Sequence, residues 1–163
     1  MMKPSAGLSA TLLFVVGTTP LSALFAQPAP QTPRTVWDGV YTSAQAARGE
    51  AEYNRYCSSC HMPDLLGNPT HPPGQPPTRT FTGVRSGTPP LRGAQFVANW
   101  TGLTLSDLFT RNRVSMPQAA PGSLSRQQNA DILAYILSQN GYPAGTTELP
   151  RDDAPLAEFR IVQ

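Results

Sequence analysis

Two cysteines and a histidine lie close together in the pattern C-x-x-C-H, as Cys57, Cys60 and His61. Thiols at this spacing can each form a thioether with one vinyl group on the same edge of a porphyrin, and the adjacent imidazole can then bind the iron. The two cysteines are the only ones in the chain, so a zinc cluster of four thiolates is excluded. The pattern predicts one covalently bound haem c with His61 as an axial iron ligand.

Two other interpretations of the cysteine pair predict a protein without haem. A redox-active dithiol of the thioredoxin kind needs a βαβ context, and no strand pattern lies near Cys57. A surface disulfide between Cys57 and Cys60 suits an oxidising compartment but leaves His61 unexplained. A dithiol oxidoreductase therefore stays open as a weaker alternative.

The second axial ligand of the iron has three candidates. Met62 adjoins His61 and is tethered to the same face of the haem, so it cannot reach the opposite face. Met116 precedes Pro117 between two expected helices, where a loop can lay a thioether over the far face. His71 lies in a proline-rich stretch and would give bis-histidine ligation, but a surface position is the simpler interpretation. Met116 is the predicted ligand.

The axial ligands decide between two functional classes. When the protein fills both axial positions of the iron, no room is left for oxygen or peroxide. A soft thioether ligand also raises the reduction potential, which suits one-electron transfer. The expected function is therefore that of an electron carrier and not of an enzyme. The alternative is a haem enzyme with an open iron position that acts on peroxide or a small gas.

Capping patterns mark the starts of three helices, at Thr42-x-x-Gln45, Thr104-x-x-Asp107 and Ser125-x-x-Gln128. The first helix should deliver the chain to Cys57, and its small residue Gly49 permits close approach of a second helix. A shorter helix is expected over residues 94–99, and residues 62–90 should be a long loop because prolines and glycines are dense there. The sequence predicts an all-α domain of four to five short helices around one haem.

The segments outside the helical domain have their own composition. Residues 1–26 have the charged start, apolar core and small final residue of a signal peptide. An uncleaved anchor is the rival interpretation, but the unbroken apolar run is shorter than the ~20 residues of a spanning helix. Residues 27–41 should form an extended leader, residues 42–145 the haem domain, and residues 146–163 an irregular tail. We expect no membrane span in the mature chain.

The charge of the expected mature chain excludes one class of partner. From Gln27 onward it carries eleven arginines, no lysine and ten acidic residues, a net charge of +1, which is too balanced for nucleic-acid binding. Five arginines lie between positions 79 and 113, with one acidic residue among them. They form either a solvated face that also pairs with haem propionates or a docking surface for an acidic redox partner. These are Arg79, Arg85, Arg92, Arg111 and Arg113.

Residues from Trp37 to Gly145 resemble a class I cytochrome c. The resemblance rests on the C-x-x-C-H site, on Pro89-Pro90-Leu91-Arg92-Gly93, on Ser115-Met116-Pro117, and on helix residues that match the crossing of the first and last helices, namely Gly49, Tyr53 and Tyr135. It implies that Pro89 accepts a hydrogen bond from the axial histidine, that Leu91 contacts the haem, and that Trp100 bonds a haem propionate. It also implies export to the periplasm, where bacteria attach this haem.

A narrower similarity concerns the stretches at 38–41 and 121–125, which resemble those of small bacterial periplasmic cytochromes. Some of these are partners or subunits of quinoprotein alcohol dehydrogenases. The resemblance implies a dehydrogenase as electron donor and an oxidase or another cytochrome as acceptor. The chain departs from the family in its long proline-rich insertion after His61 and in its lack of surface lysines, which argues against docking through a lysine ring.

Overall fold

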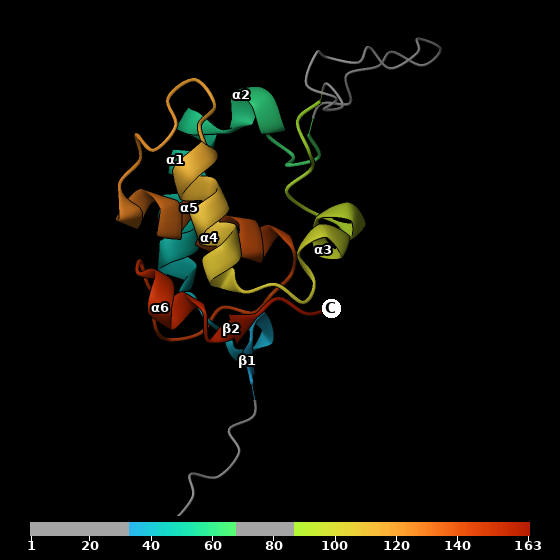
Figure 1. Cartoon of the computed structure of the whole chain (residues 1–163), viewed down its shortest axis with the longest axis vertical. Coiled ribbons are helices and arrows are strands. Elements are labelled where there is room, and N and C mark those ends of the chain that lie inside the picture. The colour runs from blue at the N-terminus through green and yellow to red at the C-terminus, as the bar shows by residue number, and fades with distance from the viewer. Residues whose placement is uncertain (1–32, 68–86) are drawn as a thin grey trace, which may run out of the picture. The chain divides into compact units, whose positions relative to one another are not determined.

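The computed structural model describes residues 33–67 and 87–163, and this part of the chain is mostly helical (Figure 1). The predicted all-α class is confirmed, with six α-helices in place of the four to five expected, because two are single turns of four residues. The elements in chain order are β1 (Arg34–Thr35), a 3-10 helix (Val36–Asp38), α1 (Ser43–Tyr56), α2 (Ser58–His61), α3 (Ala94–Trp100), α4 (Leu105–Ser115), α5 (Arg126–Gln139), α6 (Asp153–Leu156) and β2 (Phe159–Arg160).

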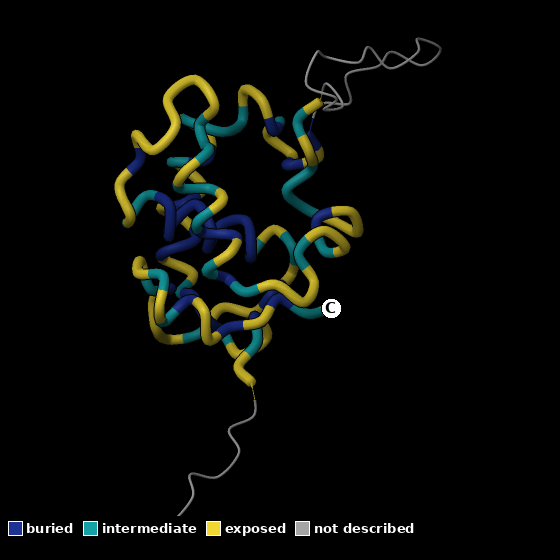
Figure 2. The backbone as a smooth tube through the Cα atoms, in the orientation of Figure 1, coloured by how far each residue is buried: buried dark blue, intermediate teal, exposed yellow. Residues whose placement is uncertain are grey.

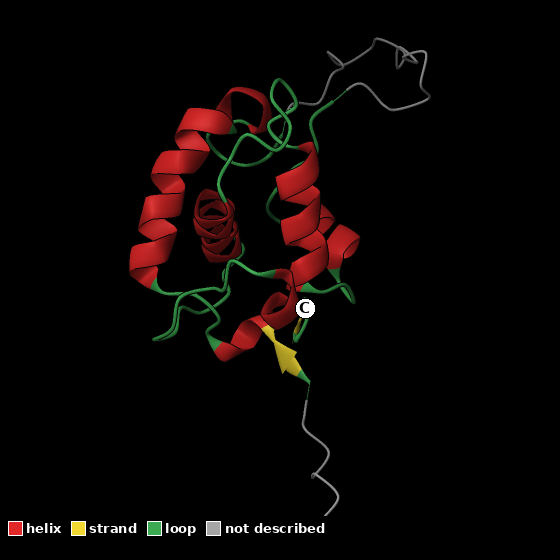
Figure 3. Cartoon of the chain, turned by 60° about the vertical axis from the view of Figure 1, so that its left-hand side comes forward, coloured by secondary structure: helices red, strands yellow, loops and turns green. Residues whose placement is uncertain are grey.

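Three long helices, red in Figure 3, form most of the domain. They begin at the predicted caps. The side chains of Thr42, Thr104 and Ser125 each accept a hydrogen bond from the backbone N–H three residues later. At α4 and α5 the bond is reciprocal, because Asp107 and Gln128 accept from the N–H of the cap residue. Each cap satisfies donors that a helix start otherwise leaves unpaired, which contributes about 1 kcal/mol.

Helices α1 and α5 cross closely at Gly49, as the sequence predicts. A Cβ atom on Gly49 would lie 1.8 Å from the carbonyl oxygen of Asp131, so a side chain there would force the helices apart. The rings of Tyr53 and Tyr135 pack one turn along, with centroids 5.3 Å apart. Arg48 forms two hydrogen bonds of 3.1 Å to the carboxylate of Asp131 beside the crossing. The crossing fixes the direction in which α1 delivers Cys57.

Helix α5 is the centre of the hydrophobic core. Every residue from Asn129 to Leu137 is buried, and this stretch lies within the dark-blue interior of Figure 2. A helix that is apolar on all sides is stable only when other elements surround it. Buried side chains from the rest of the described chain supply that surrounding, and the largest are Tyr53, Phe96, Phe109, Leu65, Leu105, Leu156 and Ile161.

The expectation of an irregular tail is wrong for part of residues 146–163, which contain α6 and β2. Strand β2 pairs in parallel with β1 of the leader. The 3-10 helix Val36–Asp38 corrects the expectation of a leader extended throughout. Leu156 and Ile161 are fully buried. The backbone of Arg160 pairs with that of Thr104, at the start of α4, in an isolated antiparallel β-bridge. The tail folds because these apolar side chains cover the end of the core, a long-range contact that local sequence does not reveal.

The leader is anchored through aromatic residues. The Tyr41 hydroxyl donates a 2.6 Å hydrogen bond to the carbonyl of Tyr142. Trp37 packs edge-on against the Tyr142 ring, with centroids 4.9 Å apart, although Trp37 is 48% exposed. The predicted signal peptide and most of the proline-rich loop lie outside the described residues. Within the described residues, every helix is too short or too polar to cross a bilayer.

Candidate haem site

The cysteine pair lies at the junction of α1 and α2. The N–H of Cys57 still bonds to Tyr53 as the last turn of α1, at 2.8 Å. The carbonyl of Cys57 then accepts from the N–H groups of Cys60 and His61, at 3.1 and 2.9 Å, and these bonds form the turn of α2. Cys57 is half-buried and Cys60 is exposed, and both thiols are free. The turn places both thiols and the imidazole within a single helical turn, as attachment to one porphyrin edge requires.

The imidazole of His61 is held in one orientation. His61 is 6% exposed, and its Nδ1 lies 2.9 Å from the carbonyl oxygen of Pro89. A carbonyl can only accept a hydrogen bond, so Nδ1 carries the proton. A neutral imidazole protonated at Nδ1 has its lone pair on Nε2, where a metal can bind. The hydrogen bond to a proline carbonyl that the family resemblance implies is thus present.

The histidine-side segments, residues 62–67 and 87–93, pack closely on each other. Gly67 has a φ of +71°, and a Cβ atom there would lie 2.3 Å from the carbonyl oxygen of Thr88. Five hydrogen bonds hold these segments. Three join backbone groups: Gly67 N–H to the His61 carbonyl, Leu65 N–H to the Met62 carbonyl, and Leu91 N–H to the Leu65 carbonyl. Two come from hydroxyl groups: Tyr53 donates to the Met62 carbonyl and Thr88 to the Cys60 carbonyl. Pro89, whose carbonyl accepts the hydrogen bond from His61, is therefore held in place.

The acidity of Cys57 argues against a dithiol enzyme. Burial, and to a lesser degree the neighbouring Cys60, raises the pKa of the Cys57 thiol to about 11. Catalytic and redox-active cysteines need a lowered pKa, because the thiolate is the nucleophile. The unattached thiol of Cys57 would be protonated at neutral pH, which suits a site for covalent attachment and disfavours disulfide exchange.

Met116 begins a second segment, the methionine-side segment, residues 116–124. It ends α4, and its N–H bonds to the carbonyl of Asn112 at 2.9 Å. The last turn of α4 leads toward the end of the domain at which α2 lies (Figure 1). Met116 lies between α4, which stops before Pro117, and α5, so its predicted position between two helices is confirmed. Its ligation of iron stays a prediction.

The buried side chain of Asn129 on α5 holds both ends of the methionine-side segment. Its Oδ1 accepts from the Asn112 side chain at 3.0 Å, one turn before Met116. Its Nδ2 donates to the carbonyls of Leu124 and Ser125, at 3.2 and 2.8 Å. Asn129 is fully buried, so these bonds replace water for all its polar atoms. Sequence reasoning missed Asn129, and its only signal was a polar residue at the start of an apolar run.

The residues present fit an apolar, iron-containing disc attached through sulfur. The donor set consists of two free thiols and an imidazole with its lone pair directed away from Pro89. Five apolar side chains that pack on the core are only partly buried and so offer contact surface for a flat ring; these are Tyr56, Cys57, Leu91, Val97 and Trp100. Leu91 and Trp100 are among these half-buried residues, and the haem contact and propionate bond that the family resemblance implies for them stay predictions.

Some residues named in the sequence analysis fall outside the described part of the chain. His71, Arg79 and Arg85 lie outside the described residues, so the proposed arginine surface is described only from Arg92 onward. Among residues 33–67 and 87–163, histidine, cysteine and acidic side chains form no group of three or more that could hold a metal ion.

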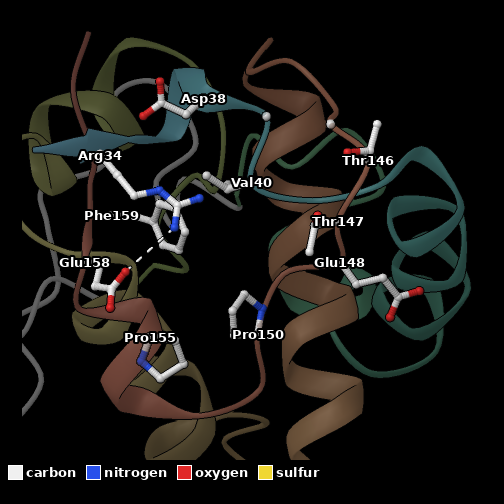
Figure 4. A pocket seen from close by; sticks show the side chains of 12 residues that line it. Arg34, Asp38, Val40, Thr146, Thr147, Glu148, Pro150, Pro155, Glu158 and Phe159 are labelled. Carbon is white, nitrogen blue, oxygen red and sulfur yellow. Dashed lines mark ion pairs between the residues drawn. The ribbon is translucent and has the colours of Figure 1, made fainter. Parts of the chain in front are cut away.

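A pocket at the other end of the domain contains none of the predicted site residues. Figure 4 shows it between the leader and the tail, with Arg34 and Glu158 paired at 3.7 Å across one side. Val40, Phe159 and two prolines complete its apolar wall. It is formed by the folding of the tail and has no connection with the chemistry of Cys57 to His61.

Comparison with known proteins gives one result. A family model described as "Cytochrome C oxidase, cbb3-type, subunit III" matches residues 44–136, from the start of α1 to near the end of α5. The match includes the cysteine pair, His61, Pro89 and Met116. No curated protein and no solved structure is similar enough to the chain to count as a match.

Proposed function

Because the chain belongs to this family of c-type cytochrome domains, we propose that it is an exported one-electron carrier with His61 and Met116 as axial ligands of its haem. Membership implies one covalently bound haem c, since the chain has a single C-x-x-C-H site with Cys57 and Cys60. When bound, haem supplies a reversible one-electron change between ferric and ferrous iron.

The hydrogen bond from His61 to Pro89 is the observation that carries this proposal. It fixes the tautomer in which Nε2 can bind iron, and it makes the imidazole a stronger donor because the proton on Nδ1 is partly drawn toward the carbonyl. The imidazole is also buried, which keeps water from competing for it. A histidine with no such role would gain little from a buried, fixed orientation.

The position of Met116 supports a filled second axial site. A thioether stabilises ferrous iron and raises the reduction potential, which suits a carrier that accepts electrons from a dehydrogenase. An open iron position acting on peroxide or a small gas is the disfavoured alternative. It would call for polar groups that activate a substrate on the face opposite His61.

The partners and the location are part of the same proposal. The C-x-x-C-H site and the signal-like residues 1–26 both favour export, with cleavage near Ala26 and a periplasmic mature chain. The family to which the chain belongs is described as an oxidase subunit, which favours an oxidase or another cytochrome as acceptor. A dehydrogenase is the proposed donor.

Visible spectroscopy of the exported protein and two variants tests the proposal. His61→Ala should fail to give stable holoprotein, while Met116→Ala should keep the attached haem and lose the absorption band that reports a thioether on ferric iron. Met62→Leu is the control, since its loss of a thioether on the histidine side should leave the band intact. A colourless wild-type protein would refute haem attachment, and a normal band in Met116→Ala would refute Met116 as ligand.

A further inference from the structure

We propose that Asn140, at the C-terminal end of α5, is a positioning residue that sets the strength of the hydrogen bond between His61 and Pro89, and thereby the reduction potential. The inference rests on the proposed role of His61 as an iron ligand. The side-chain hydrogen bonds of Asn140 go to Leu91, Gly93 and Ile136 and not to His61 or Pro89, so it acts through the backbone of residues 89–93.

The side chain of Asn140 forms hydrogen bonds on both of its polar atoms to one short stretch of the histidine-side segments. Its Nδ2 donates to the carbonyl of Leu91 at 2.9 Å. Its Oδ1 accepts from the N–H of Gly93 at 3.0 Å. An amide that pairs in this way with two backbone groups two residues apart fixes the stretch in both position and direction. Asn140 thus ties residues 91–93 to the central helix of the core.

The sequence between Leu91 and the acceptor carbonyl is stiff. Pro89 and Pro90 have fixed φ angles and lack N–H groups, so they cannot be held by backbone donors of their own. Leu91 is the first residue after Pro89 with an N–H, and that group bonds to Leu65 at 2.8 Å. Its carbonyl is the group that Asn140 holds. A displacement of Leu91 is therefore passed through the rigid ring of Pro90 to the Pro89 carbonyl, which accepts the hydrogen bond from His61.

Capping of α5 does not account for this side chain. The backbone N–H of Asn140 already bonds to the carbonyls of Ile136 and Leu137. The next two residues close the helix end as well, because the N–H of Gly141 bonds to Ser138 and that of Tyr142 bonds to Leu137. The Asn140 amide adds one bond to Ile136, at 2.8 Å. Its other two bonds serve residues 91–93.

The expected effect on the potential has a definite sign. With the Asn140 bonds removed, the Pro89 carbonyl is held less firmly, and its hydrogen bond from the Nδ1–H of His61 becomes weaker. The imidazole then becomes a weaker donor, ferric iron is less stabilised, and the reduction potential rises. The same loosening lets the Nδ1 proton exchange with water more often.

The test compares Asn140→Ala with two controls in the exported holoprotein. Gln139→Ala removes an exposed side chain one residue earlier. Ile136→Val removes a buried methyl group from the same helix and leaves every hydrogen bond of residues 91–93 in place. For each protein, the reduction potential, the exchange rate of the His61 Nδ1 proton in the ferrous state by NMR, and the free energy of unfolding by urea are measured.

Asn140→Ala should raise the potential and increase the exchange rate of the Nδ1 proton about fivefold or more, since one hydrogen bond corresponds to roughly that factor. Ile136→Val should lower stability without either change, and Gln139→Ala should alter none of the three. If Asn140→Ala gives no folded holoprotein, Asn140→Ser, which keeps a hydroxyl at the helix end, is expected to show the same rise.

Two results would overturn the inference: a loss of stability in the Asn140 variants without a change in potential or exchange, or no change in any measurement. Failure of the underlying function is separate and visible in the wild type. In that case His61→Ala would still yield normal holoprotein, or the wild-type spectrum would lack an iron-bound imidazole.

Discussion

The histidine-side and methionine-side segments are held to the core in different ways. The histidine-side segments bond to each other, to Tyr53 on α1 and to Asn140 on α5, and they approach so closely at Gly67 that a Cβ atom has no space. In the methionine-side segment, the backbone hydrogen bonds seen among the described residues are local, from Met116 to Asn112, Ala120 to Pro117 and Ser123 to Ala120. Residues 118–123 are exposed.

The difference indicates that the two proposed ligands respond differently to stress. A ligand in a tightly bonded segment is lost only when the surrounding structure unfolds, whereas a segment with few buried contacts opens at a lower free energy. Partial denaturation should therefore release Met116 from iron before His61. Four substitutions and one matched control test this difference between the two segments.

Gly67→Ala should have the largest effect, because it opposes both the backbone conformation and the packing. A left-handed φ of +71° costs an alanine about 1–2 kcal/mol, and overpacking against the Thr88 carbonyl adds about 1–3 kcal/mol. We expect a loss of about 3 kcal/mol or more in the free energy of unfolding of the holoprotein, measured by urea titration. A loss under about 1 kcal/mol would mean that the histidine-side segments are not tightly packed.

Asn129→Ala tests the anchor of the methionine-side segment. The substitution leaves the Asn112 amide and the Leu124 carbonyl without their buried partner, and an unpaired buried group costs about 1–3 kcal/mol. We expect the thioether-to-iron band to disappear at lower urea concentration than in the wild type, while haem attachment and the His61 spectrum persist.

Asn112→Ala is the matched control for this effect, since it removes only one of the hydrogen bonds and should shift the band less. If the band and the whole fold of Asn129→Ala were lost at the same urea concentration, the two segments would open together, and the methionine side would not be the weaker one.

Gly122→Ala provides the counterpart of Gly67→Ala on the methionine side. The two glycines have nearly the same φ, +74° and +71°, but a Cβ atom on Gly122 would have no neighbour closer than the Arg113 carbonyl at 3.8 Å. Only the conformational cost remains, about 1–2 kcal/mol. The loss of unfolding free energy in Gly67→Ala minus that in Gly122→Ala, both measured by urea unfolding, gives the cost of packing at Gly67. Equal losses in the two variants would mean that packing at Gly67 contributes nothing.

Much of this arrangement could be predicted from the sequence because it depends on local patterns. The helix starts at Thr42, Thr104 and Ser125 follow from capping residues, and Gly49 marked the crossing of α1 and α5. The C-x-x-C-H spacing alone identified the thiols and the imidazole. In each case the residues concerned are neighbours in the chain, or a single small residue reports the approach of a partner.

The remainder depends on contacts between distant parts of the chain. The tail was expected to be irregular because two residues are too few for a strand pattern, yet β2 forms by pairing with β1, more than a hundred residues away. In the sequence, Asn129 in α5 and Asn140 just after it are ordinary polar residues. Their roles follow from which carbonyls lie opposite them after α5 has packed, and no local pattern carries that information.

Asp107→Asn should have the smallest effect, and it tests the start of the helix that carries Met116. The backbone N–H and hydroxyl of Thr104 donate to the Asp107 carboxylate and lower its pKa, and the charge of Arg160 lowers it further. A carboxylate whose pKa is lower in the folded state stabilises the protein above its unfolded pKa of about 4 and loses this contribution as the pH falls. Because Asp107 is exposed, the contribution should stay below about 1 kcal/mol. The difference in unfolding free energy between wild type and variant should be constant above about pH 5 and shrink toward pH 2. A difference that grows as the pH falls would reverse the sign and exclude this cap as the source.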